Sequence, residues 1–141
     1  MMKTCITSDY IYAYGFEEGL KIMKSHGYDA LDYGWFCHTE NKIFHVSESE
    51  FAATLKRERA IIEDSGLFVN QTHGAWRWPA QDFSAYDRAE RYAAMETGIR
   101  GTALLGAPNF VIHCIMPFGE NNPAHKEELW QMNLDHFTPL C

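Results

Sequence analysis

The sequence predicts an α/β protein in which short parallel strands alternate with amphipathic helices. One design recurs three times, consisting of an amphipathic helix, a glycine and then a short apolar strand. The glycines are Gly27, Gly66 and Gly106, spaced by 39 and 40 residues. Each suits the left-handed backbone position that ends a helix. Strands that alternate with helices pair in parallel through right-handed crossovers.

The composition of the 141 residues is typical of one globular domain, with 46% hydrophobic and 14% aromatic residues. The formal net charge of −7 disfavours a nucleic-acid partner, because an acidic surface repels phosphate backbones. No apolar run approaches the roughly 20 residues of a membrane span, and the N-terminus does not resemble a signal peptide. We therefore expect a cytoplasmic protein with free thiols and no membrane partner.

The first part of the chain contains two predicted strands and one predicted helix. The strands span about 3–8 and 28–33, and the helix spans about 17–26. Leu20 and Met23 mark the inner face of this helix, since they are three residues apart.

The second predicted helix begins with the sequence Ser-Glu-Ser-Glu at 47–50, which is typical of a capping box. Phe51, Leu55 and Ile62 form its apolar stripe. Strands follow at 67–72 and 109–113, with a helix at 86–105 between them. Gly98 and Gly101 weaken that helix by about 1 kcal/mol each and favour close packing on the sheet.

The last segment, 122–141, predicts the start of a fourth long helix, with Pro139 in an unusual place that indicates a kink. Parallel sheets rarely stop at four strands. One fold that would complete such a sheet is the doubly wound, flavodoxin-like fold, which usually needs a fifth strand. The other is an eight-stranded barrel of about 250 residues or more. We predict the barrel, with residues 1–141 as its N-terminal part of about four βα units, truncated in helix four.

Polar side chains gather at the predicted strand ends, where parallel α/β proteins place their chemistry. Asp32 lies late in the second strand, and His73 and His113 close the third and fourth. Neighbouring strands are about 4.8 Å apart, so the two histidines should lie within side-chain reach of each other. Histidines so placed act as metal ligands, proton shuttles or donors to a hydroxylated substrate, although either one is also compatible with a structural role.

Aromatic residues follow the same strand ends and are candidates for the wall of an apolar pocket. They are Trp35, Trp76, Trp78 and Phe118.

Other features predict no chemistry. The cysteines are expected to be small core residues, and the charge run at 56–59 is expected to form a solvated helix face. Cys37-His38 with His45 has no recognised metal spacing.

Three segments resemble strands two to four of the xylose isomerase-like TIM barrels. They are Gly-Tyr-Asp-Ala-Leu-Asp at 27–32, Ser-Gly-Leu-Phe-Val-Asn-Gln-Thr-His at 65–73 and Leu-Gly-Ala-Pro-Asn-Phe-Val-Ile-His at 105–113. Two positions depart from the family pattern, since Cys114 stands where proline is frequent and Asp32 where glutamate is commoner.

The resemblance implies a metal-dependent isomerase or epimerase that acts on a sugar, sugar phosphate or keto acid. His73 and His113 would be catalytic, and Asp32, Trp35, Trp76 and Phe118 would bind substrate. A divalent ion (Mn, Mg, Co or Zn) would be bound mainly by residues of strands five to eight, and the resemblance assigns no residue of this chain to it.

Two alternatives stay open. In an endonuclease IV-like zinc phosphodiesterase, His73 and His113 would be zinc ligands. Alternatively, the chain is an inactive half-barrel fragment that associates with itself through exposed sheet edges. We expect weak or no activity from the isolated 141 residues.

Overall fold

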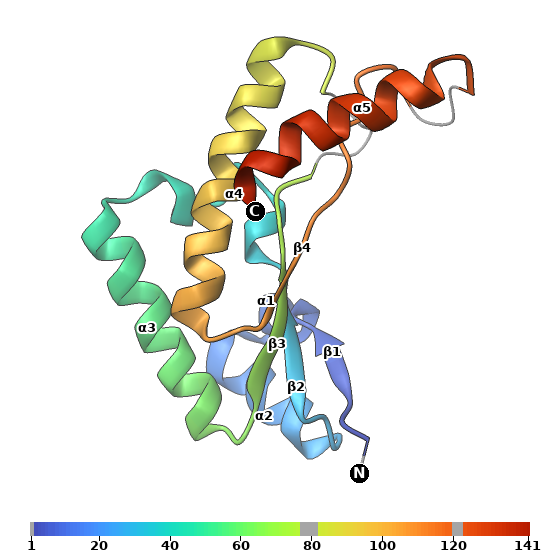
Figure 1. Ribbon diagram of the computed structural model, residues 1–141. Helices are drawn as coiled ribbons and strands as arrows, with labels where there is room; N and C mark the ends of the chain where they lie inside the picture. The colour runs from blue at the N-terminus through green and yellow to red at the C-terminus, as the bar shows by residue number, and fades with distance from the viewer. Residues whose placement is uncertain (1, 77–81, 120–122) are drawn as a thin grey trace.

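The computed structural model describes residues 2–76, 82–119 and 123–141 (Figure 1). Its strands are β1 (Cys5–Thr7), β2 (Ala30–Tyr33), β3 (Phe68–His73) and β4 (Asn109–Val111). Its α-helices are α1 (Asp9–Tyr14), α2 (Phe16–Ser25), α3 (Glu48–Asp64), α4 (Ala85–Leu105) and α5 (Lys126–Phe137). Short 3₁₀ helices lie at Trp35–Cys37 (η1), Lys42–His45 (η2), Pro123–His125 (η3) and Thr138–Leu140 (η4).

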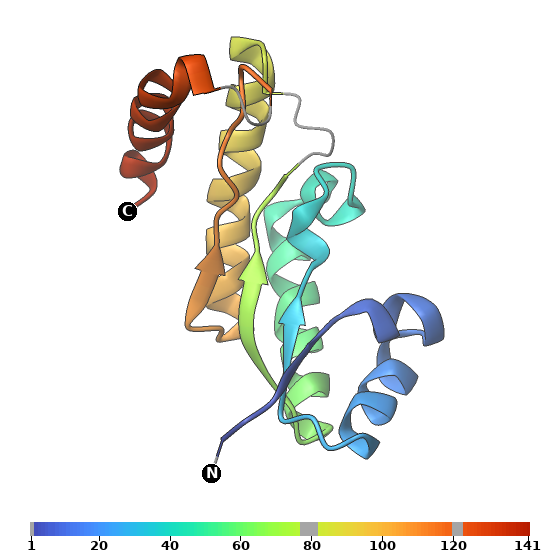
Figure 2. The ribbon, with the colours of Figure 1, turned by 90° about the vertical axis from the view of Figure 1, so that its right-hand side faces the viewer.

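The strands form one parallel sheet in the order β1-β2-β3-β4, so each strand pairs with the next one along the chain. Consecutive pairing with right-handed crossovers places successive helices on the same face. Figures 1 and 2 show α3 and α4 together on one side of β3 and β4. The predicted barrel-type order is confirmed. The flavodoxin-like alternative is wrong, because that fold reverses its strand order.

The local signals at the helix ends act as predicted. Gly27, Gly66 and Gly106 have φ values of 84°, 78° and 72°, which is the left-handed conformation that glycine adopts without a Cβ clash. At the start of α3, the Ser47 hydroxyl accepts a hydrogen bond from the Glu50 N–H, which is one of the two bonds of the predicted capping box. A full reciprocal capping box forms at the start of α4, between Ser84 and Asp87, and was not predicted.

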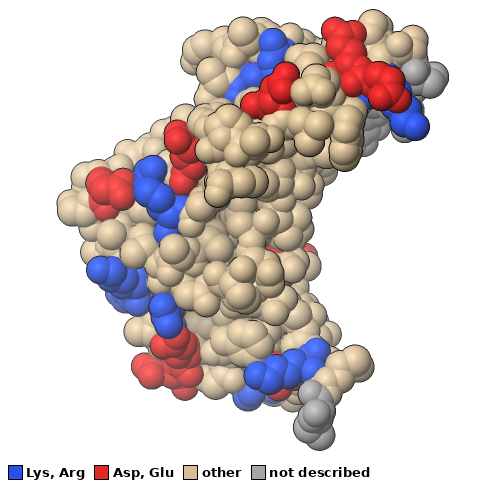
Figure 3. Space-filling model, in the orientation of Figure 1, with Lys and Arg blue, Asp and Glu red and all other residues tan. Residues whose placement is uncertain are grey.

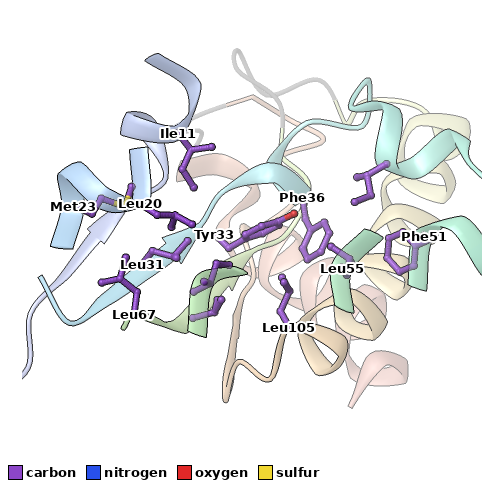
Figure 4. Packing of buried hydrophobic residues seen from close by; sticks show 13 residues of the cluster. Ile11, Leu20, Met23, Leu31, Tyr33, Phe36, Phe51, Leu55, Leu67 and Leu105 are labelled. Atoms are coloured by element: carbon purple, nitrogen blue, oxygen red, sulfur yellow. The ribbon is translucent and has the colours of Figure 1, made fainter. Parts of the chain in front are cut away.

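The main core lies between the sheet and helices α2, α3 and α4 (Figure 4). Leu31, Tyr33 and Phe36 are fully buried at its centre. The Tyr33 hydroxyl donates to the Glu58 carboxylate at 2.7 Å, which satisfies two polar groups inside this core. Glu58 is only 8% exposed, so the prediction of a fully solvated face at 56–59 is wrong for this residue.

The two glycines within α4 have the packing role that the sequence indicated. A Cβ on Gly101 would lie 2.4 Å from Cζ of Phe36, and one on Gly98 would lie 2.9 Å from Cε2 of Phe110. Only a residue without a side chain lets α4 approach these aromatic rings so closely.

Helix α5 begins at Lys126, later than predicted, and ends at Phe137. Pro139 lies in the 3₁₀ turn that follows, so it does not kink the helix. The Asn133 side chain attaches α5 to the segment after β4, because it accepts from the Ile115 N–H at 2.8 Å and donates to the Ile115 carbonyl at 3.0 Å. Figure 3 shows charged side chains along the outer edge at α3 and around α5, with few between them.

Within the described residues, no helix is long and apolar enough to cross a membrane.

We expect Gly101→Ala to destabilise the protein, because the new methyl group overlaps the buried Phe36 ring. Overpacking costs about 1–3 kcal/mol, and the better helix propensity of alanine offsets about 1 kcal/mol of that loss. Urea denaturation should show a net loss of up to about 2 kcal/mol. The loss should shrink when Phe36 is also replaced by Leu, and additive effects of the two substitutions would contradict the proposed contact.

Candidate functional site

A one-residue register shift between β2 and β3 decides which side chains meet at the strand ends. Leu31 pairs with Val69, but the next residue, Asp32, pairs with Gln71, so Asn70 is an extra residue on β3. Because side chains alternate between faces along a strand, one extra residue exchanges the faces of all those that follow. Gln71 and His73 therefore share the face of Asp32, opposite to the helices.

The shift brings three polar side chains into contact. The Gln71 amide donates to Oδ2 of Asp32 at 2.8 Å, and Nε2 of His73 lies 2.9 Å from the same oxygen. The Asp32 and His73 side chains are 16% and 26% exposed. Oδ1 of Asp32 is buried and has no hydrogen-bond partner among the described residues.

His113 extends this array from the segment that follows the neighbouring strand, β4. Its Nε2 lies 3.2 Å from Nδ1 of His73, and its ring stacks on the Trp76 ring at a centroid separation of 5.3 Å. The structure thus brings together Asp32, His73, His113 and Trp76, four of the six residues predicted for the site. Gln71 belongs with them but was not singled out, because an amide at a strand end is not a specific signal.

Burial lowers the pKa of His113, and the nearby His73 and the Arg91 guanidinium lower it further. All three effects lower the pKa of His113, because each disfavours its imidazolium form. Neutral imidazole is therefore favoured at His113, and neutral imidazole can both donate and accept a proton.

A buried ion pair between Arg91 and Asp82 supports the backbone behind this array. Nη1 of Arg91 lies 2.5 Å from Oδ2 of Asp82, with the side chains 3% and 0% exposed. Arg91 also donates to the carbonyls of Ala75 and His113, which follow β3 and β4. The prediction missed this pair. The sequence signal for this pair was the helical spacing of Arg91 from Ala94 and Met95, which places the arginine on the buried face of α4.

The other predicted aromatic residues lie elsewhere. Trp35 packs against Phe16 and Tyr33, with centroid separations of 5.8 and 5.4 Å, on the helix side of the sheet. Phe118 stacks on His125 at 4.4 Å, next to the start of α5. Among the described residues, the ring contacts of Trp35 and Phe118 are with side chains other than His73 and His113. Trp78 lies outside the described residues.

The cysteines were expected to be core residues, but the structure contradicts this expectation. Cys5, Cys114 and Cys141 are exposed, and Cys37 is half-buried. Burial raises the pKa of the Cys37 thiol to about 11, and the Asp32 carboxylate adds to this effect. The thiol of Cys37 is therefore protonated at neutral pH and is a poor nucleophile.

The array does not form a complete metal site. Across the described ranges, no group of three or more His, Cys, Asp or Glu side chains is placed to hold an ion. Both ring nitrogens of His73 already contact protein atoms. The described side chains alone therefore do not form a binding site for a divalent ion.

Loss of the Arg91 charge should destabilise the fold strongly, because it leaves the buried Asp82 carboxylate without its partner. We expect Arg91→Met to lower the free energy of unfolding by about 3–5 kcal/mol, measured by urea denaturation. Arg100→Met is the matched control, since Arg100 pairs with Glu48 at 3.5 Å on the surface, with the side chains 53% and 72% exposed. Its loss should stay below about 1 kcal/mol. Equal losses for the two variants would contradict the anchoring role.

Replacement of His73 by Asn should raise the pKa of His113, because it removes the electrostatic effect by which His73 lowers that pKa. An NMR titration of the histidine ring protons measures this shift. His136 is the internal control. Its pKa is lowered by burial and by arginines, with no contribution from His73, so its titration should not move. An unchanged His113 titration would show that the rings are not coupled.

Comparison with known proteins identifies the fold. No protein-family model matches the chain, and neither does any curated protein. A xylose isomerase-like protein from Rhodospirillum rubrum matches with a TM-score of 0.69 at 15% identity, over 97% of this chain and 48% of that one. A xylose isomerase domain protein from Alicyclobacillus acidocaldarius matches with a TM-score of 0.58 at 15% identity, over 99% and 47%. The chain spans about half the length of these structures, and it has the fold of half a xylose isomerase-like TIM barrel.

Proposed function

We propose that this chain forms part of an isomerase or epimerase that moves a proton next to the carbonyl of a sugar, sugar phosphate or keto acid. The observation that supports it best is the hydrogen-bonded array of Asp32, His73 and His113 at the carboxyl ends of three adjacent strands. Enzymes with this barrel fold place their active sites at that end of the strands.

Nε2 of His73 lies 2.9 Å from Oδ2 of Asp32 and 3.3 Å from Nε2 of Gln71. We take the shorter contact as the hydrogen bond when we assign the protons within the array. A carboxylate only accepts, so Nε2–H of His73 donates to Asp32. Nδ1 of neutral His73 is then an acceptor, and Nε2–H of His113 donates to it. This order leaves Nδ1 of His113 as the accepting end of the chain.

Such an arrangement suits proton transfer or the binding of a hydroxyl group. Asp32 holds the tautomer of His73, and His73 in turn orients His113, in the way that a base is oriented by a third group. The stacked Trp76 ring covers one face of His113. His73 and His113 would together bind substrate oxygen atoms. Alternatively, His113 would accept a proton while the proton on Nε2 of His73 stays in place.

The proposal includes the divalent ion that the family resemblance implies. An ion of this kind polarises a carbonyl oxygen and stabilises negative charge on it. Since the described side chains do not fit such an ion, we propose that most of its ligands lie outside these 141 residues.

The test is an assay of the complete gene product with Mn²⁺ or Mg²⁺ on aldoses, ketoses, sugar phosphates and keto acids in D₂O. We expect deuterium to enter the carbon next to the carbonyl. Loss of a general acid or base costs about 10²–10⁴ in rate, so His113→Asn should lower kcat/KM by at least about 10²-fold. His45→Asn is the control, because His45 lies in η2 and its described hydrogen bond is a local one, to the Thr39 carbonyl.

Absence of both turnover and metal binding would overturn the proposal. Cleavage of abasic-site DNA in place of isomerisation would identify the endonuclease IV-like alternative.

A further inference from the structure

A pocket lies on the helix side of the sheet, between α3 and the segment that contains η1 and η2. We call it the α3 pocket. Its volume is about 280 Å³, close to the roughly 300 Å³ at which small-molecule sites begin. Trp35, Ile43 and Val46 form the apolar part of its lining. These side chains can bury the apolar body of a ligand, so the polar groups of the lining decide which ligand fits.

Glu58 provides an acceptor at the buried end of the α3 pocket. The residue is 8% exposed, and its Oε2 accepts from the Tyr33 hydroxyl at 2.7 Å. The other oxygen, Oε1, has no hydrogen-bond partner among the described residues, yet it is not fully enclosed by protein atoms. Since Glu58 lines the pocket, this oxygen is accessible from it. An unpaired carboxylate oxygen at this depth is costly, and a ligand that donates to it removes the cost.

Two cationic side chains, Lys42 and Arg57, line the outer part of the α3 pocket. Both are exposed, and neither forms an ion pair with a described residue. Burial raises the pKa of the Glu58 carboxyl, whereas the Tyr33 hydrogen bond and the charges of Arg57 and Lys42 counteract part of this rise. The two cations therefore lie within electrostatic reach of the buried carboxyl.

The charges of the lining balance. Glu50, Arg57 and Glu58 are spaced as i, i+7 and i+8, which places them on one face of α3. With Lys42 they give two carboxylates and two cations, so the lining is formally neutral but presents both signs. Such a lining is complementary to a ligand that also carries both signs. An ammonium group donates three N–H bonds, and a carboxylate accepts from lysine or arginine.

We propose that the α3 pocket binds a free α-amino acid with an apolar side chain. The ammonium group of the ligand donates to Oε1 of Glu58, its carboxylate accepts from Lys42 and Arg57, and its side chain packs on Trp35. The described lining shares no residue with the array of Asp32, His73 and His113. This binding site is therefore independent of the proposed isomerase function.

Binding to the ¹⁵N-labelled chain, followed by NMR, tests the proposal. L-leucine is the probe, and two analogues each lack one of its charges, 3-methylbutylamine without the carboxylate and 4-methylpentanoate without the ammonium group. We expect leucine to shift the amides of Ile43 and Thr54, which both line the pocket. Each analogue should bind at least about tenfold more weakly, because it leaves part of the lining unpaired.

Variants of the lining then test which group binds which end of the ligand. Glu58→Gln removes the charge, keeps an acceptor for the Tyr33 hydroxyl and should weaken both leucine and 3-methylbutylamine. Arg57→Gln should weaken leucine and leave 3-methylbutylamine unchanged. Lys56→Gln is the matched control, because Lys56 is the neighbouring exposed cation on α3 and does not line the pocket. Arg57 is exposed, so Arg57→Gln remains informative if Glu58→Gln does not fold.

An absence of shifts at millimolar leucine would overturn the inference, and so would shifts confined to amides outside the pocket. Binding of 4-methylpentanoate as tight as that of leucine would identify an anion site and contradict the amino-acid site. Leucine affinity that is equal in Arg57→Gln and Lys56→Gln would contradict the assigned orientation. The assay of the complete gene product on sugars and keto acids tests the isomerase separately, so either proposal can fail while the other holds.

Discussion

The pairing of β2 with β3 is the constraint on which both the core and the strand-end array depend. Its one-residue shift at Asn70 divides the side chains into two rows. Tyr33, Thr72 and Phe110 pair in register on the helix side, where Thr72 contacts the Thr102 hydroxyl at 2.6 Å. Asp32, Gln71 and His73 point the other way. A regular ladder would direct His73 toward the helices, and the array would not form.

The array is positioned by buried groups that lie behind it. Arg91 on α4 binds the backbone after β3 and after β4, and Asp82 balances its charge and accepts from the Met116 N–H at 3.3 Å. Three segments that are distant in sequence are thereby held by one pair of side chains. Because removal of one partner would leave the other charge buried and unpaired, the pair favours the arrangement in which these segments stay together.

Electrostatics divide the strand ends into two regions with different chemistry. Near His113, burial and the Arg91 charge favour the neutral imidazole. Beside β1 and β2, two carboxylates and several hydroxyls line a separate pocket. His73 belongs to both regions, since it contacts Asp32 through one nitrogen and His113 through the other.

The sequence by itself determined the alternation of helices and strands, because apolar periodicity and the glycines at 27, 66 and 106 are local signals. It also determined that His73, His113 and Asp32 lie at strand ends, since that follows from strand boundaries. Only the tertiary structure decided the faces of these side chains, because a bulge depends on the partner strand and leaves no local signal at Asn70. The same holds for Trp35, which the turn after β2 directs into the core. It holds for Glu58 and Arg91 as well, whose burial depends on partners 25 residues and 9 residues away in the chain.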